Sequence, residues 1–461
     1  MTTGNWIEKS SIELKGCQAA KVEHGQGLVA TGANAANEVL VKVPKEMLVN
    51  EKLVVEYAED KPLLKTLLHT NDKGDSTDEI ELSPRKIIAR FLLYQILAIR
   101  RGTPDETFAG WVQSMPPGRE IGLPFTWEDH DIQTLENTSI FEATVAKKHV
   151  LAVQYKGLFS GETLREKVKD YVSNGPLAKE LKEVDFEVTF NDWILVEEWI
   201  ASRAVAYPDE DKQEISLAMV PVVDLCNHKN TANALYRVAE DGSGGIELVA
   251  VKDVEKGAEI TINYGPHTGS SEFLFNYGFI PSDHTTAKKA SFFYGLYDVE
   301  FRKCIDPGFE PKAVDNPEEL PEEEQTYQIL VAFYDRKQSR ITFSQEEEDG
   351  HASWSDEFIV MYCCGDEVSL VRNEETGYFE LHFRDQELDL ENIDECIKSR
   401  DEKFYNEVVR SRGNAIVNRM LAKFFIGEPP SDVKPEHHKL FSLEQRLLKA
   451  VQDNCQSNLS A

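Results

Sequence analysis

The segment PVVDLCNH at residues 221–228 is followed by GAEITINYG at 257–265 and SEFLFNYGF at 271–279, and these three segments decide the fold expected for this chain. Upstream, GQGLV occupies residues 25–29. Each has an ordinary explanation when taken alone. A GxG is commonly a turn, an Asn-His pair can sit in a loop, and Tyr-Gly can end a strand. The order and spacing of the four segments together, rather than any one of them, indicate the fold.

Around these segments the chain alternates between strand-rich and helix-rich regions. Residues 22–55 are typical of short strands, because valines alternate between 39 and 43 before Pro44 ends the run. Ser83-Pro84 suits the start of a helix. Apolar residues then recur at helical spacing, and helix dominates to about residue 205.

Short strands return from Met219 onward, with apolar runs at 246–251 and 260–262. The region from about residue 300 to the end has the spacing of helices with apolar faces. Within it, Ser442 followed by Gln445 predicts a capping box that starts the last helix. The predicted order is a β block, a helical insert, a second β block and a helical C-terminal region.

In this order the segments closely resemble SET-domain methyltransferases of the Rubisco large-subunit methyltransferase type. GQGLV is similar to that family's GxGL turn, and WIASRA at 199–204 to its W-x-x-SR segment. The resemblance implies an α+β SET fold, in which small β-sheets with a knot-like C-terminal segment are split by a helical insertion and followed by an all-α C-terminal domain. It divides the chain into the N-terminal part of the SET domain (1–83), the helical insertion (84–205), the C-terminal part with the cofactor and catalytic motifs (206–295) and a helical substrate-binding domain (296–461).

The resemblance also implies the cofactor S-adenosylmethionine. Glycines at the GxGL turn would let the backbone approach it closely, since glycine lacks a β-carbon. The guanidinium of Arg203 would meet the cofactor carboxylate with two parallel hydrogen bonds. Phe279 would pack against the adenine. The cofactor-binding residues implied by the resemblance are Gly25, Gly27, Leu28, Arg203, Asp224, Asn227, His228, Tyr264 and Phe279.

The same resemblance places Tyr264 beside the methyl group and the acceptor nitrogen, as the catalytic residue. Methyl transfer from a sulfonium to an amine is an in-line displacement that needs no metal, so positioning and desolvation should supply most of the acceleration. A phenol with an ordinary pKa of about 10 is no strong base at neutral pH, so Tyr264 is expected to orient the amine. Tyr277 is expected to line the acceptor channel, with Val205 also at the acceptor site, and burial there must lower the pKa of the incoming lysine. Aromatic walls also favour a cation.

The function indicated is therefore a protein-lysine N-methyltransferase. A branch of the same group modifies a histidine of actin and carries an asparagine shortly after the motif arginine; here that position is Val205, which cannot hydrogen-bond through its side chain. A non-catalytic SET-fold module that binds a protein partner stays open. A cysteine hydrolase or metal site built on Asp224, Cys226 and His228 is disfavoured, because neither further ligands nor a base can be nominated.

Composition and net charge indicate which kinds of binding partner are compatible with this chain. The 461 residues include 41% apolar and 28% charged residues, and no apolar run approaches the roughly 20 residues of a membrane span. The net charge of −31 would repel a phosphate backbone, which disfavours direct nucleic-acid binding, and would attract a basic protein. The family resemblance adds that relatives in fungi and plants modify proteins of the translation apparatus, so ribosomal proteins or translation elongation factors are the substrates that the resemblance, together with the charge, implies. No targeting signal is visible at the N-terminus, and the seven cysteines lack CxxC spacing, so a cytoplasmic or nuclear protein without a metal is expected.

Overall fold

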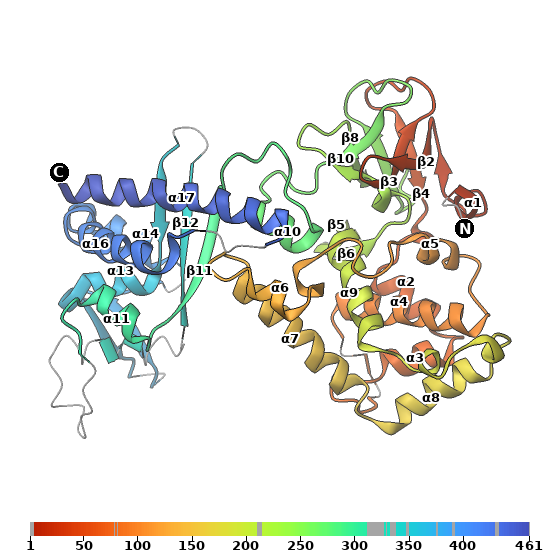
Figure 1. Ribbon diagram of the computed structural model, residues 1–461, viewed down its shortest axis with the longest axis horizontal. Helices are drawn as coiled ribbons and strands as arrows, with labels where there is room; N and C mark the ends of the chain where they lie inside the picture. Colours follow the sequence, from red (N-terminus) through yellow and green to blue (C-terminus); the bar gives the residue numbers. More distant parts are fainter. Residues whose placement is uncertain are drawn as a thin grey trace. The chain divides into compact units, whose positions relative to one another are not determined.

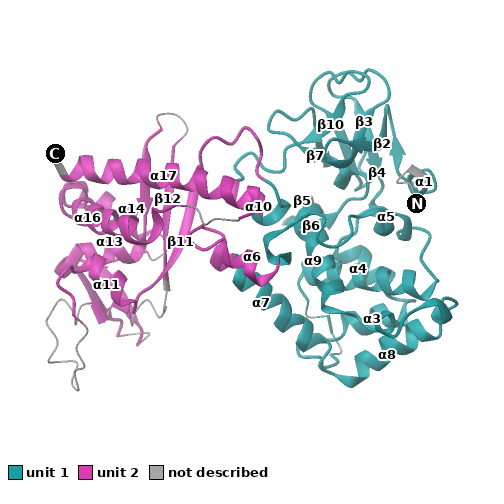
Figure 2. Cartoon of the chain, viewed as in Figure 1, with its two compact units in different colours: residues 1–127, 144–268, 275–279 teal, residues 128–143, 269–274, 280–461 magenta. Residues whose placement is uncertain are grey.

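A computed structural model of the chain describes residues 4–77, 79–80, 82–209, 214–310, 327–328, 330–331, 338–346, 350–374, 377–389, 392–428 and 433–460. The chain forms two compact units (Figure 2). Unit 1 comprises residues 1–127, 144–268 and 275–279, and unit 2 comprises residues 128–143, 269–274 and 280–461. All four segments quoted above contribute to unit 1, which therefore contains the candidate site.

Two four-stranded sheets of unit 1 join the parts of the chain on either side of the helices (Figure 1). The central pairs, β4 with β9 and β3 with β10, are antiparallel, whereas β10 and β7 are parallel. A separate hairpin consists of β5 (Ala204–Asp209) and β6 (Glu214–Met219). In sheet order, the strands are β1 (Glu13–Leu14), β4 (Val39–Val43), β9 (Ile246–Ala250) and β8 (Ala234–Val238), then β2 (Cys17–Val22), β3 (Gly25–Ala30), β10 (Glu259–Ile262) and β7 (Asn227–His228).

Helices fill the chain between β4 and β5. Helix α4 (Pro84–Arg101) begins directly after Ser83, as predicted, and ends at Gly102, whose φ of 85° suits glycine. No helix in the described part of the chain combines the length and apolarity that a membrane crossing requires. The other helices and 3₁₀ turns of unit 1 and of the segment 128–143 are α1 (Gly4–Ile7), η1 (Lys45–Met47), α2 (Glu51–Tyr57), α3 (Pro62–Leu68), α5 (Ala109–Ser114), η2 (Pro124–Thr126), α6 (Asp129–Gln133), α7 (Phe141–Leu158), α8 (Glu162–Ser173), η3 (Ala178–Glu180), η4 (Glu183–Phe186), α9 (Phe190–Arg203) and η5 (Val223–Leu225).

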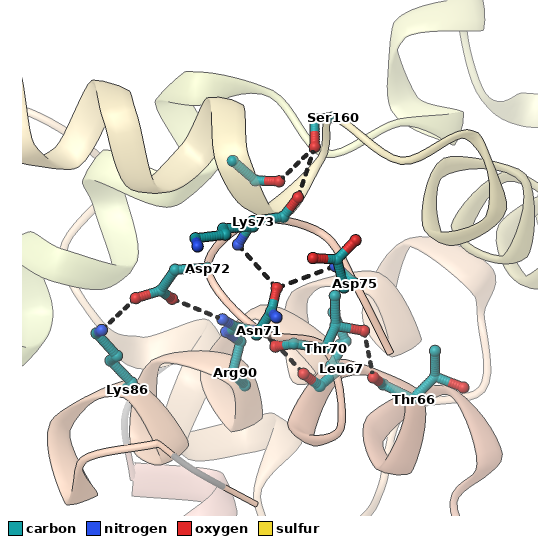
Figure 3. A network of polar contacts seen from close by, with 11 residues as sticks. Thr66, Leu67, Thr70, Asn71, Asp72, Lys73, Asp75, Lys86, Arg90 and Ser160 are labelled. Atoms are coloured by element: carbon teal, nitrogen blue, oxygen red, sulfur yellow. Dashed lines mark hydrogen bonds and ion pairs between the residues drawn. The ribbon is translucent and has the colours of Figure 1, made fainter. Parts of the chain in front are cut away.

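The loop between α3 and α4 is anchored by polar contacts (Figure 3). The side-chain oxygen of Asn71 accepts two backbone N–H groups of the same loop, at 2.9 and 3.0 Å. Asp72 pairs with the buried guanidinium of Arg90 at 3.3 Å. On the other side, a β-carbon on Gly157 would lie 1.9 Å from the carbonyl oxygen of Asp72. Glycine in α7 therefore lets this loop pack directly on the helix backbone.

Unit 2 is helical, as expected, but not exclusively so, and the expected all-α domain has to be corrected to a mixed one. It contains the antiparallel sheets β11–β12–β13 and β14–β15–β16. Apolar and polar residues alternate in β11, which buries Ala290, Phe292 and Tyr294 on one face. Its elements are α10 (Ser270–Tyr277, ending in unit 1), β11 (Lys289–Gly295), α11 (Val299–Ile305), β12 (Gln338–Gln345), β13 (Ala352–Ser355), α13 (Glu357–Cys364), η7 (Gly365–Glu367), β14 (Val368–Arg372), β15 (Phe379–Phe383), β16 (Gln386–Glu387), α14 (Ile393–Arg400), α15 (Glu402–Phe404), η8 (Tyr405–Arg410), α16 (Ser411–Met420), η9 (Leu421–Phe425) and α17 (Pro435–Ser460).

The last helix, α17, lies beside β12 and β13 (Figure 1) and starts earlier than predicted. It begins at Pro435, so Ser442 lies inside it and donates to the carbonyl of His438 at 2.8 Å. The side chain of Gln445 instead donates to the carbonyl of Phe425 at 2.6 Å. The predicted capping box at Ser442 is therefore wrong, because its two side chains bond elsewhere.

Helix α17 also carries a buried carboxyl that predicts how the stability of unit 2 depends on pH. Glu444 accepts the backbone N–H of Ser139 at 3.1 Å, and burial raises its pKa to about 7. The folded state therefore holds a proton that the unfolded state releases near pH 4.5, and its stability falls as the pH rises between these values. The expected loss is about 3 kcal/mol from this group alone.

Glu444→Gln should remove this loss while keeping a hydrogen-bonding side chain. We expect the free energy of unfolding of unit 2, measured by urea denaturation at pH 5 and pH 8, to fall less between the two pH values than in the wild type. Asp356, another buried carboxyl with a pKa raised to about 7, leaves a residual slope. The control is Asp453→Asn on the exposed side of α17. Equal slopes for the wild type and Glu444→Gln would contradict the prediction.

Candidate active site

Strand β10 brings three of the quoted segments together. Its residue Ile260 pairs with Leu28 of β3, and Ile262 pairs with His228 of β7. Tyr264 follows two residues after the end of the strand. The GxGL turn and the Asn-His pair, far apart in sequence, thus lie on strands that flank β10, and the Asn-Tyr-Gly segment directly follows β10.

Tyr264 lies among other aromatic rings. Its hydroxyl donates to the carbonyl of Cys226 at 2.8 Å. Its ring centroid is 4.6 Å from that of Tyr277 and 5.3 Å from that of His228. Burial raises the pKa of Tyr264 well above its usual range, although the nearby Arg203 opposes the shift. The phenol is therefore neutral at physiological pH, and its hydroxyl is held by the carbonyl of Cys226.

The imidazole of His228 is oriented by two hydrogen bonds. Nδ1 accepts the backbone N–H of Tyr264 at 3.2 Å, and Nε2 lies 3.1 Å from the side-chain oxygen of Asn230. These partners select the tautomer with its proton on Nε2. The ring of Phe279 lies 6.3 Å from the imidazole and is 36% exposed, which leaves an aromatic face accessible to a ligand.

The glycine-rich turn differs in detail from its expected role. A β-carbon on Gly25, where φ is 94°, would meet nothing within 4 Å, so the space next to this residue is open. A β-carbon on Gly27 would lie 2.8 Å from Val22 and 3.1 Å from the carboxylate of Glu259. The absence of a side chain at Gly27 therefore leaves room for these two side chains of the protein itself. Leu28 is fully buried, which leaves its side chain in the core. Roles of these residues toward a cofactor stay predictions.

Asn227 and Glu259 form a second polar contact at the site. The side-chain amide of Asn227 donates to the Glu259 carboxylate at 2.8 Å. Asn227 itself lies on β7, which pairs with β10. The carboxylate therefore fixes the asparagine side chain beside the segment that carries His228.

Arg203 and Asp224 meet because β6 pairs with β5 and so returns the chain to the C-terminal end of α9. Arg203 is the last residue of α9, and the next residue, Ala204, pairs with Met219. The guanidinium Nη1 donates to the backbone carbonyl of Asp224 at 2.8 Å and lies 3.6 Å from its carboxylate. Arg203 Nε and Asp224 Oδ1 are buried and have no hydrogen-bond partner within the described ranges. The arginine predicted to meet a cofactor thus also has an internal acidic partner.

The two residues predicted at the acceptor site come from separate elements. Val205 is half-buried on β5, opposite Ala218. Tyr277 ends α10 and is followed by Gly278, with φ of 78°, where a β-carbon would lie 2.2 Å from the carbonyl oxygen of Ile121. Glycine is needed here because a loop of the helical insertion packs against the turn that presents Tyr277.

Three residues near the site were missed by the sequence reasoning. Tyr236 on β8 donates to the carbonyl of Ala206 at 3.2 Å. Burial is the main cause that raises the pKa of Tyr277, and Tyr236 raises it further. Glu259 lies inside a quoted segment, but nothing in sequence indicated its contact with Asn227. Trp111 of α5 donates to Asp224 at 3.0 Å. No motif contains Tyr236 or Trp111, so no local signal could have identified them.

The arrangement offers hydrogen-bonding groups and aromatic faces rather than metal ligands. Within the described ranges, no group of three or more His, Cys, Asp or Glu side chains could hold a metal ion. Burial raises the pKa of the Cys226 thiol well above its usual range, which makes this cysteine a poor nucleophile. The site is suited to binding a ligand with a flat ring and a charged head, and to orienting an acceptor beside Tyr264.

Comparison with known proteins gives a family match over the central region. The family described as the SET domain matches residues 25–265. The SET domain-containing protein 8 of Schizosaccharomyces pombe is 26% identical over 56% of this chain and 52% of its own length. An actin-histidine N-methyltransferase of Gallus gallus is 27% identical over 59% of this chain and 41% of its own length. The match spans about half the length of these curated relatives.

Solved structures extend the likeness to nearly the whole chain. The structure described as the SET domain of LSMT bound to lysine and AdoHcy has a TM-score of 0.63 at 14% identity, covering 98% of this chain and 90% of that one. Rubisco LSMT bound to sinefungin and monomethyllysine has a TM-score of 0.57 at 12% identity, covering 99% and 92%. The predicted resemblance and the SET fold class are confirmed.

Proposed function

The chain belongs to the SET domain family, and we propose that it is an S-adenosylmethionine-dependent protein methyltransferase whose acceptor is a lysine side chain. One observation carries the proposal. The hydroxyl of Tyr264 is fixed on the carbonyl of Cys226, and its ring lies between Tyr277 and the oriented imidazole of His228. A fixed hydroxyl next to an aromatic wall is what an uncharged amine needs in order to approach an electrophilic methyl group.

The residues present fit the cofactor. The unpartnered Arg203 Nε suits a carboxylate, the exposed face of Phe279 suits a purine ring, and the open space at Gly25 admits a ligand next to the backbone. When bound, S-adenosylmethionine supplies a methyl group on a positively charged sulfur. Its binding residues would be Arg203, Asn227, His228 and Phe279.

The residues of the chain then have to position the acceptor. With the cofactor bound, the lysine nitrogen would displace the sulfur at the methyl carbon: a nitrogen–carbon bond would form as the carbon–sulfur bond breaks, and one proton would leave the nitrogen for water. Tyr264 holds the nitrogen in line through its hydroxyl. It does not take the proton, because burial keeps the phenol neutral. The packed rings of Tyr264 and Tyr277 exclude water from one side of the acceptor site, which lowers the pKa of an amine placed beside them and favours its reactive neutral form.

A histidine acceptor is the second candidate, and it is favoured by the actin-histidine N-methyltransferases among the relatives. We prefer lysine because the position two residues after Arg203 is Val205, a half-buried side chain that packs against the core. Valine offers an imidazole no hydrogen bond. A non-catalytic SET-fold module is the third candidate.

We further propose that the substrate is a basic protein of the translation apparatus, a ribosomal protein or elongation factor, met in the cytoplasm or nucleus. The support is the net charge of −31, which attracts basic surfaces over distances of about a Debye length. The helical and sheet-containing unit 2 is the proposed substrate-binding part.

Incubation with labelled S-adenosylmethionine and an extract lacking the protein tests these proposals. The labelled protein is isolated, and mass spectrometry locates the modified residue. A methylated lysine supports the proposal, and a methylated histidine supports the second candidate. Cofactor binding in calorimetry with no transfer to any protein would instead support a binding module. Absence of both binding and transfer would contradict the cofactor assignment itself.

A further inference from the structure

The Arg203–Asp224 pair depends on groups outside the quoted segments. The Asp224 side chain is 2% exposed and that of Arg203 is 17% exposed, and a guanidinium with this little solvent contact is stabilised by a nearby anion. The anion is Asp224, whose carboxylate has almost no contact with solvent. Burial raises the pKa of Asp224, whereas Arg203, the indole N–H of Trp111 and the backbone N–H of Val222 lower it. These donors therefore oppose the effect of burial on the Asp224 carboxylate.

Trp111 is the side-chain donor that reaches the carboxylate from another element. Its Nε1–H donates to Asp224 Oδ2 at 3.0 Å, and the residue is 1% exposed. The indole is held in place because α5 packs against α4 and α1. A β-carbon on Gly110 of α5 would lie 2.2 Å from Trp6 of α1, so the two helices are in direct contact at this glycine. The donor is thus rigidly placed.

The second donor comes from a constrained turn. Val222 has φ of 75° and ψ of −48°, a conformation that β-branched residues rarely adopt, and it is fully buried. The next two residues lead directly to Asp224. The structure therefore holds a costly backbone conformation where it presents an N–H to this carboxylate.

The pair also reaches the reacting groups. Arg203 lies close enough to lower the pKa of Tyr264, and Asp224 raises it slightly in return. Arg203 is also the residue expected to meet the cofactor carboxylate. If Asp224 lost its orientation, both the contact of Arg203 with the cofactor and the electrostatic environment of Tyr264 would therefore change.

We propose that Trp111 is a positioning residue of the active site: its indole N–H fixes the Asp224 carboxylate, and Asp224 in turn holds the Arg203 guanidinium where the charged head of the cofactor binds. This inference rests on the proposed function, since it assigns the cofactor to that site. Because Trp111 is 1% exposed, the inference assigns it no direct contact with cofactor or acceptor.

The test compares two tryptophan variants by calorimetric titration with S-adenosylhomocysteine. Trp111→Phe removes the donor and keeps an aromatic ring. Trp193→Phe makes the same truncation at a residue that is 2% exposed and whose indole nitrogen has no partner in the described part of the chain. We expect Trp111→Phe to weaken binding about tenfold, as for loss of a hydrogen bond to a charged group, and Trp193→Phe to leave it within about twofold.

A pH profile separates positioning from packing. Trp111→Phe removes the indole hydrogen bond that lowers the pKa of Asp224. The loss of S-adenosylhomocysteine affinity at acid pH, which we call the acid limb, should therefore begin at a higher pH in the variant. The other titratable groups facing Asp224 are Arg203, Cys226 and Tyr264, and all are unchanged in the variant. In the wild type, one of the six indole N–H signals of a ¹⁵N-tryptophan-labelled sample should shift in parallel with that limb. This readout needs no variant.

A double-variant cycle adds a third arm. If Trp111 acts through Asp224, then Trp111→Phe should change affinity far less in an Asp224→Asn background than alone. Equal affinities and acid limbs for both tryptophan variants, or no pH-dependent indole signal, would overturn the inference while leaving the methyltransferase proposal in place. A wild type that binds no S-adenosylhomocysteine would contradict the proposed function and the inference with it.

Discussion

Tyr264→Phe is expected to lower kcat by roughly ten- to a thousand-fold, a loss of about 1.4 to 4 kcal/mol of transition-state stabilisation, while cofactor affinity barely changes. The phenylalanine ring keeps the contacts with Tyr277 and His228, whose centroids lie 4.6 and 5.3 Å away. Only the hydroxyl on the carbonyl of Cys226 disappears. Binding and chemistry should therefore separate, which single-turnover kinetics and calorimetry can measure on the same preparation.

Tyr155→Phe is the matched control. The hydroxyl of Tyr155 also donates to a backbone carbonyl, that of Val188, at 2.9 Å, and its ring is also packed against other aromatic rings. It shows what the loss of a tyrosine–carbonyl bond costs when no chemistry depends on it. If kcat of Tyr264→Phe stays within a few-fold of the value for Tyr155→Phe, Tyr264 merely packs and the catalytic role is refuted.

Asn227→Ala and His228→Ala are expected to abolish cofactor binding, by at least about 100-fold, while the fold survives. The reason is that each removes a polar group oriented by a neighbour: Asn227 by the Glu259 carboxylate at 2.8 Å, and His228 by the N–H of Tyr264 at 3.2 Å. Both lie on a two-residue strand at the margin of a sheet, so little core packing is lost. Titration with S-adenosylhomocysteine and a thermal melt measure the two effects.

Asn233→Ala provides the control, because Asn233 also bonds to β10. Its amide donates to the carbonyl of Glu259 at 2.8 Å and accepts the N–H of Thr261 at 2.8 Å. It should lower the melting temperature without changing affinity. Should Asn227→Ala and His228→Ala behave like Asn233→Ala, with wild-type affinity and reduced stability, these residues would be structural and the site assignment would be wrong.

Several features were predictable because their signals are local. The start of α4 at Pro84 after Ser83, and its end at Gly102, follow from backbone preferences of proline and glycine that act on neighbouring residues. The order of the quoted segments was sufficient to predict the SET fold class. The neutral state of Tyr264 was predictable in direction, since burial of any phenol raises its pKa.

Other local patterns were misread. Residues 338–345 and 379–383 form β12 and β15 within the region 296–461 that was expected to be helical, because short strands and helix segments give similar apolar content. The pair Ser442 and Gln445 has the spacing of a capping box but lies within α17, since packing extends that helix back to Pro435. Local spacing allows such elements without requiring them.

The sequence by itself determined the family and predicted the segments that meet at the candidate site, because those properties depend on residue identity and on spacing along the chain. Only the tertiary structure decided which side chains orient them. Trp111 reaches Asp224 from a helix 113 residues away, and Glu259 reaches Asn227 across the pair β10–β7. Such contacts form when distant elements pack together, and the free energy of burying them depends on the whole core, which no local pattern in the sequence encodes.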